Sequence, residues 1–461
     1  MLANIYIRNF RSIKEIVFPI KNGLNVIVGS NGSGKTNILH ALKFLSNIVT
    51  SGASLAMAKA GGPSRNFRRG ENSIEFSVHY VLDHSLFKGK QATFFLFWDV
   101  VVSQSEEGGF VHVRKEVVRI VALSSEGKED VLKAEVTRTS AGAVRPKFEI
   151  VSEDLITKRL FESSYWVGSS FKKSEVVSTV SEKFQEVLQE AKKGAQDASF
   201  IAQASFCHAN FRRFFRDISS LDEYNISPDV ARQAVDPLPV VRMGPDGGGV
   251  SEVVGALENR QFSRIRRGGA PYPGTTYYYA HHWSEYSSPL GQKNNPLPVI
   301  LEHVQAAIPS IDSIGTQIDP SSGRRFVVFG CGGSLFRPQE MSDGTFKWLC
   351  LLVALLVPTT RVVLLEEPEN FMHPWMQQRF ISLARQQASS DNTSVVLSTH
   401  SVTVLNSLVV DELRVVHQVD GETVMNSVEN KEEIERILSE STFGLGDIWI
   451  SGEFGGVTGG F

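Results

Sequence analysis

Three short apolar runs, far apart along the chain, predict strands that are buried on both faces of a parallel sheet. They are Asn25–Val28, Arg361–Leu365 and Ser394–Leu397. Such strands are nearly continuously apolar because helices cover both faces of the sheet. Apolar residues at helical spacing follow the first run over Thr36–Leu45 and precede the second over Phe346–Val357. This alternation of strand and helix predicts an α/β fold.

The long stretch between the first and second runs has a different pattern. Residues 74–151 are β-rich, and residues 154–235 change to helical spacing. One compact α/β unit does not need so much chain between two of its strands, so we expect an insertion. We therefore predict two halves of one α/β domain at residues 1–90 and 241–461, separated by an inserted lobe at residues 91–240.

A glycine-rich segment follows the first predicted strand and fits the phosphate-binding pattern G-x-x-x-x-G-K-[ST]. Its glycines let backbone amides approach an anion, and the helix that follows places its N-terminus at the phosphates. Lys35 would reach the β- and γ-phosphates, and the hydroxyl of Thr36 would hold magnesium. The context predicts that the chain binds ATP or GTP. The candidate binding residues are Gly29, Ser30, Asn31, Gly32, Ser33, Gly34, Lys35, Thr36 and Asn37.

Polar residues also mark the later elements. Ser342 stands at the start of an apolar helix, where its hydroxyl and the free N–H groups can bind an anion. Glu366 and Glu367 follow the second predicted strand, and His400 follows the third. Ligands of open α/β sheets bind at the carboxyl edge of the strands, so we expect these side chains beside the phosphate loop.

In this order, the segments resemble the ABC-type ATPases of the AAA family, in the branch that contains SMC, RecF and overcoming-lysogenization-defect (OLD) proteins. The resemblance covers roughly residues 1–80 and 240–461. It implies an ABC-type ATPase head, with a mixed sheet flanked by helices, and ATP and Mg2+ as cofactors. It also implies a role for each site residue: Ser342, Asp343 and Gly344 form a signature that contacts the γ-phosphate held by the opposite subunit, Glu366 and Thr36 hold Mg2+, Glu367 is the catalytic base, and His400 contacts the γ-phosphate.

Two positions depart from the family pattern. Glu366 stands where most ABC-type proteins have Asp, so its carboxylate is one methylene further from the backbone. The Gln that normally links the γ-phosphate to the helical region is not identifiable. Both departures leave open a slow hydrolysis, or a hydrolysis that depends on a partner.

Composition adds few constraints. The chain has 461 residues, of which 42% are hydrophobic and 21% charged, as is usual for a soluble globular protein. We found no uncharged apolar run long enough to span a bilayer and no signal peptide at the first residues. The three cysteines form no C-x-x-C pair, which fits a reducing compartment. We therefore expect a cytoplasmic protein that does not bind membranes.

Two local patches leave DNA binding possible, although the net charge of −3 does not favour it. Asn210–Arg216 mixes arginine with phenylalanine, and Arg264–Gly269 precedes several tyrosines. Arginine neutralises phosphate, and aromatic rings can stack on bases. For the first patch, an amphipathic helix with a phenylalanine face in the core is the better interpretation. For the second, a basic loop and a nucleic-acid site remain equal alternatives.

The resemblance implies an ATPase that forms a homodimer, or a higher even oligomer, around ATP. We expect it to be the sensor or motor subunit of a multi-protein antiphage defence system of bacteria. Its effector would be a separately encoded protein such as a TOPRIM nuclease, because no acidic motif of that domain follows His400. One alternative is a RecF-like repair or recombination ATPase that binds DNA directly. Another is a scaffold that ATP stabilises and that hydrolyses it little.

Overall fold

The computed structural model describes most of the chain, in two compact units. The described residues are 2–87, 90–105, 109–124, 127–138, 143–152, 199–204, 209–237, 241–259, 295–357, 361–390, 393–427, 431–440 and 444–451, with single helical positions between 178 and 189. The first unit contains Met1–Lys21, His40–Ser219 and Gln418–Val424; the second contains Asn22–Leu39, Ser220–His417 and Met425–Phe461. The basic patch Arg264–Gly269 lies outside the described residues. The predicted division at residues 90 and 240 stays a prediction.

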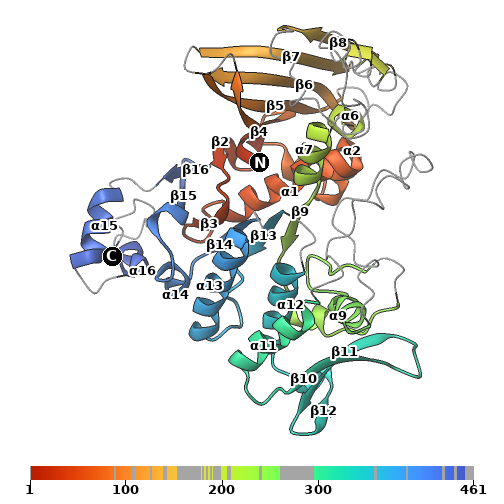
Figure 1. The fold of residues 1–461 in the computed structure, drawn as a ribbon, viewed down its shortest axis with the longest axis vertical. Coiled ribbons are helices and arrows are strands. Elements are labelled where there is room, and N and C mark those ends of the chain that lie inside the picture. Colours follow the sequence, from red (N-terminus) through yellow and green to blue (C-terminus); the bar gives the residue numbers. More distant parts are fainter. Residues whose placement is uncertain are drawn as a thin grey trace. The chain divides into compact units, whose positions relative to one another are not determined.

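The first unit is built on a seven-stranded antiparallel sheet in the order β2-β1-β4-β5-β6-β7-β8 (Figure 1). One face of this sheet is apolar and buried, and the other carries polar and charged residues, as is usual for an antiparallel sheet. The strands are β1 (Leu2–Phe10), β2 (Ile13–Pro19), β4 (Ser73–Phe87), β5 (Lys90–Gln104), β6 (Val111–Ser124), β7 (Gly127–Arg138) and β8 (Val144–Ile150). The helices of this unit include α2 (Ala53–Lys59), α3 (Pro63–Asn66), α6 (Phe200–Ala204) and α7 (Ala209–Ser219).

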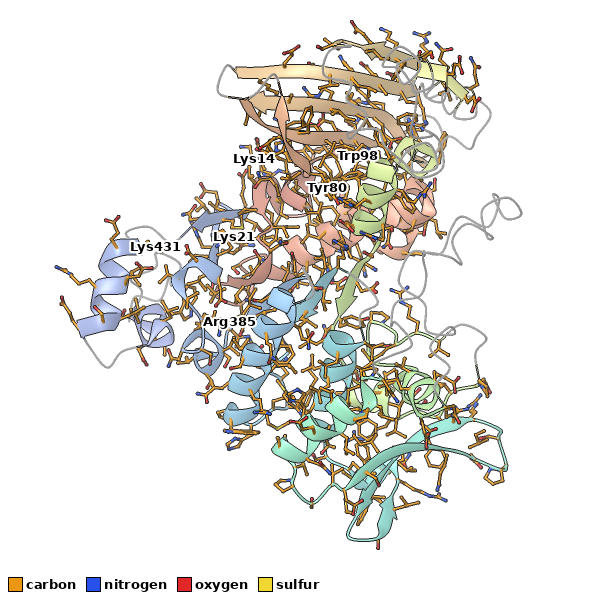
Figure 2. The ribbon with its side chains drawn as sticks, in the orientation of Figure 1. Lys14, Lys21, Tyr80, Trp98, Arg385 and Lys431 are labelled. Atoms are coloured by element: carbon orange, nitrogen blue, oxygen red, sulfur yellow. The ribbon has the colours of Figure 1, made fainter. Side chains whose placement is uncertain are left out.

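Helix α7 packs against the apolar face of this sheet. The ring of Phe214 lies 5.3 Å from that of Tyr80 on β4 and 5.9 Å from that of Trp98 on β5 (Figure 2). Phe211 and Phe214 are fully buried, whereas Arg213 is exposed. The interpretation of Asn210–Arg216 as an amphipathic helix is therefore confirmed.

The second unit is built on a six-stranded sheet in the order β16-β15-β3-β14-β13-β9, of which Gln418–Val424, at the turn between β15 and β16, belong to the first unit. The pairs β15–β3, β3–β14, β14–β13 and β13–β9 are parallel. Together with the antiparallel sheet of the first unit, these strands confirm the predicted α/β fold with a mixed sheet arrangement. The strands are β3 (Gly23–Val28), β9 (Leu221–Tyr224), β13 (Val362–Glu366), β14 (Ser394–Thr399), β15 (Leu413–Val419) and β16 (Glu422–Ser427).

Helices and a small antiparallel sheet complete the second unit. Helix α12 is buried along nearly its whole length, from Thr345 to Leu356, which explains its continuous apolar sequence. The helices are α1 (Lys35–Ser51), which continues into the first unit, α8 (Pro228–Ala231), α9 (Val250–Glu258), α11 (Leu297–Ala307), α12 (Asp343–Leu356), α13 (Pro374–Ser390), α14 (Val402–Leu405), α15 (Lys431–Glu440) and α16 (Leu445–Ile450), and the small sheet has β10 (Ser313–Ile318), β11 (Arg325–Cys331) and β12 (Ser334–Phe336).

The register of the parallel strands brings their carboxyl ends level with one another. Val28 pairs with Thr399, Ser398 with Glu366, and Leu365 with Tyr224. The residues that follow β3, β14, β13 and β9 therefore share one edge of the sheet, as expected for the phosphate loop, the acidic pair and His400. Among the helices that the structure describes, none is both long enough and apolar enough to span a membrane.

Candidate nucleotide-binding site

The loop after β3 has the backbone geometry of a phosphate cradle. Gly32 and Gly34 have φ angles of +79° and +103°, which glycine adopts at little cost. Gly29 leaves no room for a side chain, because an added Cβ would collide with the carbonyl oxygen of Val416 and with Ser33. The Oγ of Ser33 is buried with no hydrogen-bond partner among the described residues. The loop thus combines glycines that let the backbone approach an anion with a buried hydroxyl that has no hydrogen-bond partner among the described residues.

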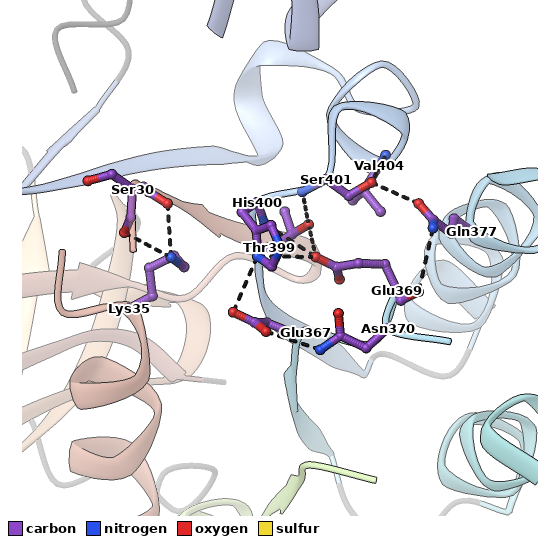
Figure 3. Close-up of polar contacts among 11 residues, drawn as sticks. Ser30, Lys35, Glu367, Glu369, Asn370, Gln377, Thr399, His400, Ser401 and Val404 are labelled. Atoms are coloured by element: carbon purple, nitrogen blue, oxygen red, sulfur yellow. Dashed lines mark hydrogen bonds and ion pairs between the residues drawn. The ribbon is translucent and has the colours of Figure 1, made fainter. Parts of the chain in front are cut away.

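Lys35 begins helix α1 and turns its ammonium back onto this loop. Its Nζ donates to the carbonyl oxygens of Gly29 at 2.9 Å and Ser30 at 3.1 Å (Figure 3). Burial lowers the pKa of Lys35, while the carboxylates that follow β13, led by Glu367, act in the opposite direction. A phosphate beside Nζ would offset the cost of burying this charge.

A second set of polar groups surrounds Glu366 at the end of β13. The hydroxyl of Thr36 donates to Glu366 Oε1, and the side-chain amide of Asn225 donates to Glu366 Oε2 at 2.8 Å. Carboxylate and hydroxyl oxygens are the ligands that Mg2+ prefers. These residues therefore fit a magnesium site, and the longer side chain of Glu366 reaches both neighbours.

Asn225 is a site residue that the sequence did not predict. It follows β9, a strand of only four residues, Leu221–Tyr224, with two acidic residues in it. No apolar run marks this strand, so only the parallel pairing of β9 with β13 reveals that Asn225 lies at the same edge as Glu366.

Glu367 and His400 meet at this edge, as the candidate base and its neighbour were expected to. Glu367 Oε1 lies 3.3 Å from His400 Nδ1, and Glu367 Oε2 accepts from the side chain of Asn370 at 3.1 Å (Figure 3). The φ angle of Glu367 is +41°, an unusual value for a residue with a side chain. Such strain is concentrated at functional sites. The side chain of Glu367 is 31% exposed and that of His400 is 47% exposed, so water can reach both.

Glu369 binds the strand end that carries His400. Its Oε1 accepts from the hydroxyl of Thr399 at 2.6 Å and from the backbone N–H of His400 at 3.3 Å. Burial raises the pKa of Glu369, and its Oε2 has no hydrogen-bond partner in the described part of the chain. A second contact runs from Ser401 Oγ to Gln377 Oε1 at 2.8 Å. The strand end that carries His400 is therefore held at two points.

The predicted signature lies at the start of α12. Ser342 caps this helix by accepting from the N–H of Thr345 at 3.2 Å, and Ser342 and Asp343 are exposed. A Cβ on Gly344 would lie 2.7 Å from the carbonyl oxygen of Phe371, so the close approach there requires glycine. The hydrogen bonds of the Ser342 side chain stay within the first turn of α12 among the described residues. No hydrogen bond joins this serine to the phosphate loop of its own chain among the residues that the structure describes.

Helix α12 also carries a buried lysine that its apolar sequence concealed. Lys347 is 1% exposed, and its Nζ donates to the carbonyl oxygen of Ile226 at 3.1 Å. Burial lowers the pKa of Lys347, and the nearby carboxylates, led by Glu369, act against this shift. The residue next to Asn225 is thereby tied to α12.

Two family models match the chain. The first, described as "AAA ATPase domain", matches residues 1–216, and the second, described as "AAA domain, putative AbiEii toxin, Type IV TA system", matches residues 204–406. Both descriptions name AAA domains, so the chain is similar to nucleotide-binding ATPase domains over these two segments. They agree with the site geometry, in which both ends of the chain contribute to one sheet edge.

Curated relatives match a short segment. The DNA replication and repair protein RecF is 50% identical over 46 residues in Francisella tularensis subsp. novicida (strain U112) and in subsp. tularensis (strain WY96-3418). These residues are 10% of this chain and span 13% of the length of each relative. The likeness is therefore to a small part of RecF.

Solved structures of SMC heads are similar over most of their length. The SMC head bound to the C-winged helix domain of ScpA is 14% identical, covers 93% of this chain and 98% of its own, and has a TM-score of 0.42. The SMC head domain from Thermotoga maritima is 10% identical, covers 93% of this chain and 99% of its own, and has a TM-score of 0.33. With TM-scores this low, the fold assignment depends on the strand order and register described above.

Proposed function

We propose that this protein is a magnesium-dependent ATPase that dimerises around ATP. One observation carries the proposal: the ends of β3, β13 and β14 bring Lys35, Glu366, Glu367 and His400 to one sheet edge. Backbone amides and Lys35 would bind the phosphates, and Thr36 and Glu366 would hold Mg2+, with Asn225 orienting Glu366. When bound, Mg2+ neutralises charge on the β- and γ-phosphates.

Glu367 is the proposed base for hydrolysis. Its carboxylate accepts a proton from a water molecule whose oxygen forms a bond to the γ-phosphorus, and the bond from that phosphorus to the β,γ-bridging oxygen breaks to release ADP. His400, 3.3 Å from Glu367, orients the carboxylate and the γ-phosphate. Asn370 fixes the second oxygen of Glu367. Water access to this pair supports the assignment.

A second copy of the chain is the proposed partner at the signature. Ser342 is exposed and bonds only within its own helical turn among the described residues. Phe371 and Trp375, which follow the acidic pair, are 61% and 45% exposed, and exposed large apolar groups favour protein contacts. In a two-fold dimer each signature would close the nucleotide site of the other subunit.

We further propose a cytoplasmic role as the sensor or motor subunit of a bacterial defence system with a separately encoded effector. The description of the family model over residues 204–406, which names the AbiEii toxin and a Type IV TA system, supports a role of this kind. The short RecF match favours a second candidate, a repair ATPase that binds DNA directly. A scaffold with little turnover is the third.

ATP hydrolysis by purified protein with Mg2+ tests the enzymatic part. Glu367→Gln should lower kcat roughly 10²–10⁴-fold, because the base is lost, while ATP affinity and ATP-dependent dimerisation persist. Lys35→Ala should lose ATP binding. Glu302→Gln, on the exposed face of α11, is the matched control and should behave as wild type. Equal, negligible turnover in wild type and Glu367→Gln would instead support the scaffold.

Affinity purification of the Glu367→Gln variant from its native host separates the two biological candidates. A stoichiometric protein partner that wild type releases on turnover would support the defence role. DNA-stimulated hydrolysis and co-purified nucleic acid without a protein partner would favour the repair role. Because the variant stays closed on ATP, it should retain whichever partner the closed dimer binds.

A further inference from the structure

Arg232 makes a set of contacts that converge on the start of the signature helix. It follows α8, and its side chain is 14% exposed. One terminal nitrogen donates to the carbonyl oxygen of Met341 at 2.8 Å and to the Asp343 carboxylate at 2.5 Å, and Nε donates to the carbonyl oxygen of Pro338 at 3.2 Å. The guanidinium also lies over the ring of Phe346, 5.3 Å from its centre. These groups lie before, within and after the predicted signature.

A guanidinium suits this task better than an ammonium. Its planar, rigid fork fixes the direction of several hydrogen bonds at once and can stack on an aromatic ring. Here it fixes the carbonyls of Pro338 and Met341, which lie on the chain just before Ser342. Ser342 itself has the extended backbone of a helix cap, with φ −69° and ψ 157°. Arg232 therefore holds two points of the chain that leads into Ser342, while its other terminal nitrogen pairs with Asp229 at 3.4 Å.

We propose that Arg232 is a positioning residue that presents Ser342 to the nucleotide bound by a second copy of this chain. The inference rests on the proposed ATP-dependent dimer. Arg232 does not contact the nucleotide of its own chain in this arrangement; its effect passes through Ser342. Loss of Arg232 should therefore impair hydrolysis at the partner's phosphate loop and leave ATP binding at its own loop intact.

A different role for Arg232 makes the opposite prediction. Arg232 lies seven residues after Asn225 in the chain that follows β9, and the side-chain amide of Asn225 donates to Glu366. If Arg232 acted by supporting Asn225, its loss would damage the nucleotide site of its own chain. The two roles are distinguished by asking which of the two sites in a mixed dimer fails.

Mixed dimers carrying two different affinity tags provide that test. One subunit carries Arg232→Ala and the other Lys35→Ala, and the heterodimer is purified through both tags. If Arg232 acts across the dimer, one site combines an intact phosphate loop with an intact signature, while the other site contains both defects. Each homodimer should be at least about tenfold slower than wild type in kcat. The mixed dimer should then regain about half of the wild-type activity.

Controls separate failure of this inference from failure of the dimer proposal. Ser342→Ala mixed with Lys35→Ala should also regain activity. If the Ser342 pair regains activity and the Arg232 pair does not, the role of Arg232 is overturned and the shared-site dimer stands. If neither pair regains activity, the shared-site dimer is wrong and the role of Arg232 falls with it.

Two arginine-to-lysine variants test whether the guanidinium fork matters. Arg232→Lys keeps the charge and a folded chain, and should still lower kcat with little change in the KM for ATP. Arg385→Lys is the matched control, because Arg385 also donates from Nε and a terminal nitrogen, to Glu412 and the Ser407 carbonyl. Its kcat should remain near wild type. Wild-type kcat in Arg232→Lys would contradict the positioning role.

Discussion

Two carboxylates of this protein, one in each unit, have opposite surroundings. Glu116 on β6 is fully buried and accepts four hydrogen bonds, from Arg138 and Trp98 at 3.2 Å, from Ser199 at 2.8 Å and from the Phe200 amide at 2.7 Å. Glu367 in the second unit is 31% exposed, and the side chains that bind its carboxylate among the described residues are those of Asn370 and His400.

The difference teaches how the same chemical group serves stability or function. A buried charge is tolerated only when donors satisfy it, and a satisfied network fixes the packing of the elements it joins. Glu116 joins β5, β6 and β7 to the start of α6 in this way. A carboxylate that must accept a proton from water needs access and a free lone pair. The proposed base Glu367 meets these needs better than Glu116 does, because it is 31% exposed and two side chains bind it in the described part of the chain.

The largest effect on folding stability is expected at Glu116. Glu116→Gln should lower the free energy of unfolding by about 3–5 kcal/mol, because the buried guanidinium of Arg138 loses its buried carboxylate partner. Urea unfolding followed by tryptophan fluorescence measures this, since Trp98 donates directly to Glu116. ATP affinity below the unfolding transition should not change, as the carboxylate has no part in the proposed site.

Glu135→Gln is the matched control in the same sheet. Glu135 lies on β7 and pairs with Lys115 at 3.2 Å, but both side chains are partly exposed to solvent. Such pairs contribute about 0–1 kcal/mol. If the two variants lost equal stability, burial would not explain the difference between the networks, and the comparison would fail.

An intermediate effect is expected at Asn225, which donates to Glu366, the carboxylate proposed to hold Mg2+. Asn225→Ala removes the hydrogen bond to Glu366 Oε2, which should raise the Mg2+ concentration needed for half-maximal hydrolysis roughly tenfold. Asn295→Ala, which removes an amide bonded to the Leu257 carbonyl, is the control and should leave the Mg2+ dependence unchanged. An unchanged Mg2+ dependence in Asn225→Ala would place Asn225 outside the metal site.

The sequence allowed the sheet edge to be predicted, because each element there carries its own local signal. An apolar strand precedes the phosphate loop, Glu366 and His400, and a parallel sheet aligns the ends of such strands. Asn225 and Arg232 had no such signal. Asn225 follows a strand of four residues, and Arg232 acts on Met341 and Asp343, more than a hundred positions later.

Buried charges were equally hidden from pattern analysis. Lys347 lies in an apolar helix and Glu116 in a strand that also carries Arg114 and Lys115, and a charged residue at such a position is expected to face solvent. Their hydrogen bonds in the structure show that both side chains point inward. Lys347 donates to the carbonyl oxygen of Ile226, and Glu116 accepts from Arg138 and three other donors. Those partners come from distant parts of the chain, so spacing alone could not identify them.

The smallest effect is expected at Glu369, which combines the burial of Glu116 with incomplete hydrogen bonding. Burial raises the pKa of Glu369 above its ordinary value of 4.5, so the folded protein binds this proton more tightly than the unfolded chain. The stability linked to that proton is full below pH 4.5 and is lost as the pH rises through the raised pKa. Glu369→Gln cannot ionise, and its amide oxygen can still accept from Thr399 and His400.

Thermal unfolding at several pH values tests whether the stability of wild type falls with rising pH while that of Glu369→Gln does not. The variant should match wild type near pH 4.5 and be more stable at pH 8 by about 1 kcal/mol, because no charge is buried there. Glu302→Gln, at an exposed site, should follow the wild-type curve. Parallel curves for wild type and Glu369→Gln would mean that the buried carboxylate is as well satisfied as Glu116. In that case hydrogen bonding would not distinguish Glu369 from Glu116, and exposure to solvent would be what separates the proposed base Glu367 from these two buried carboxylates.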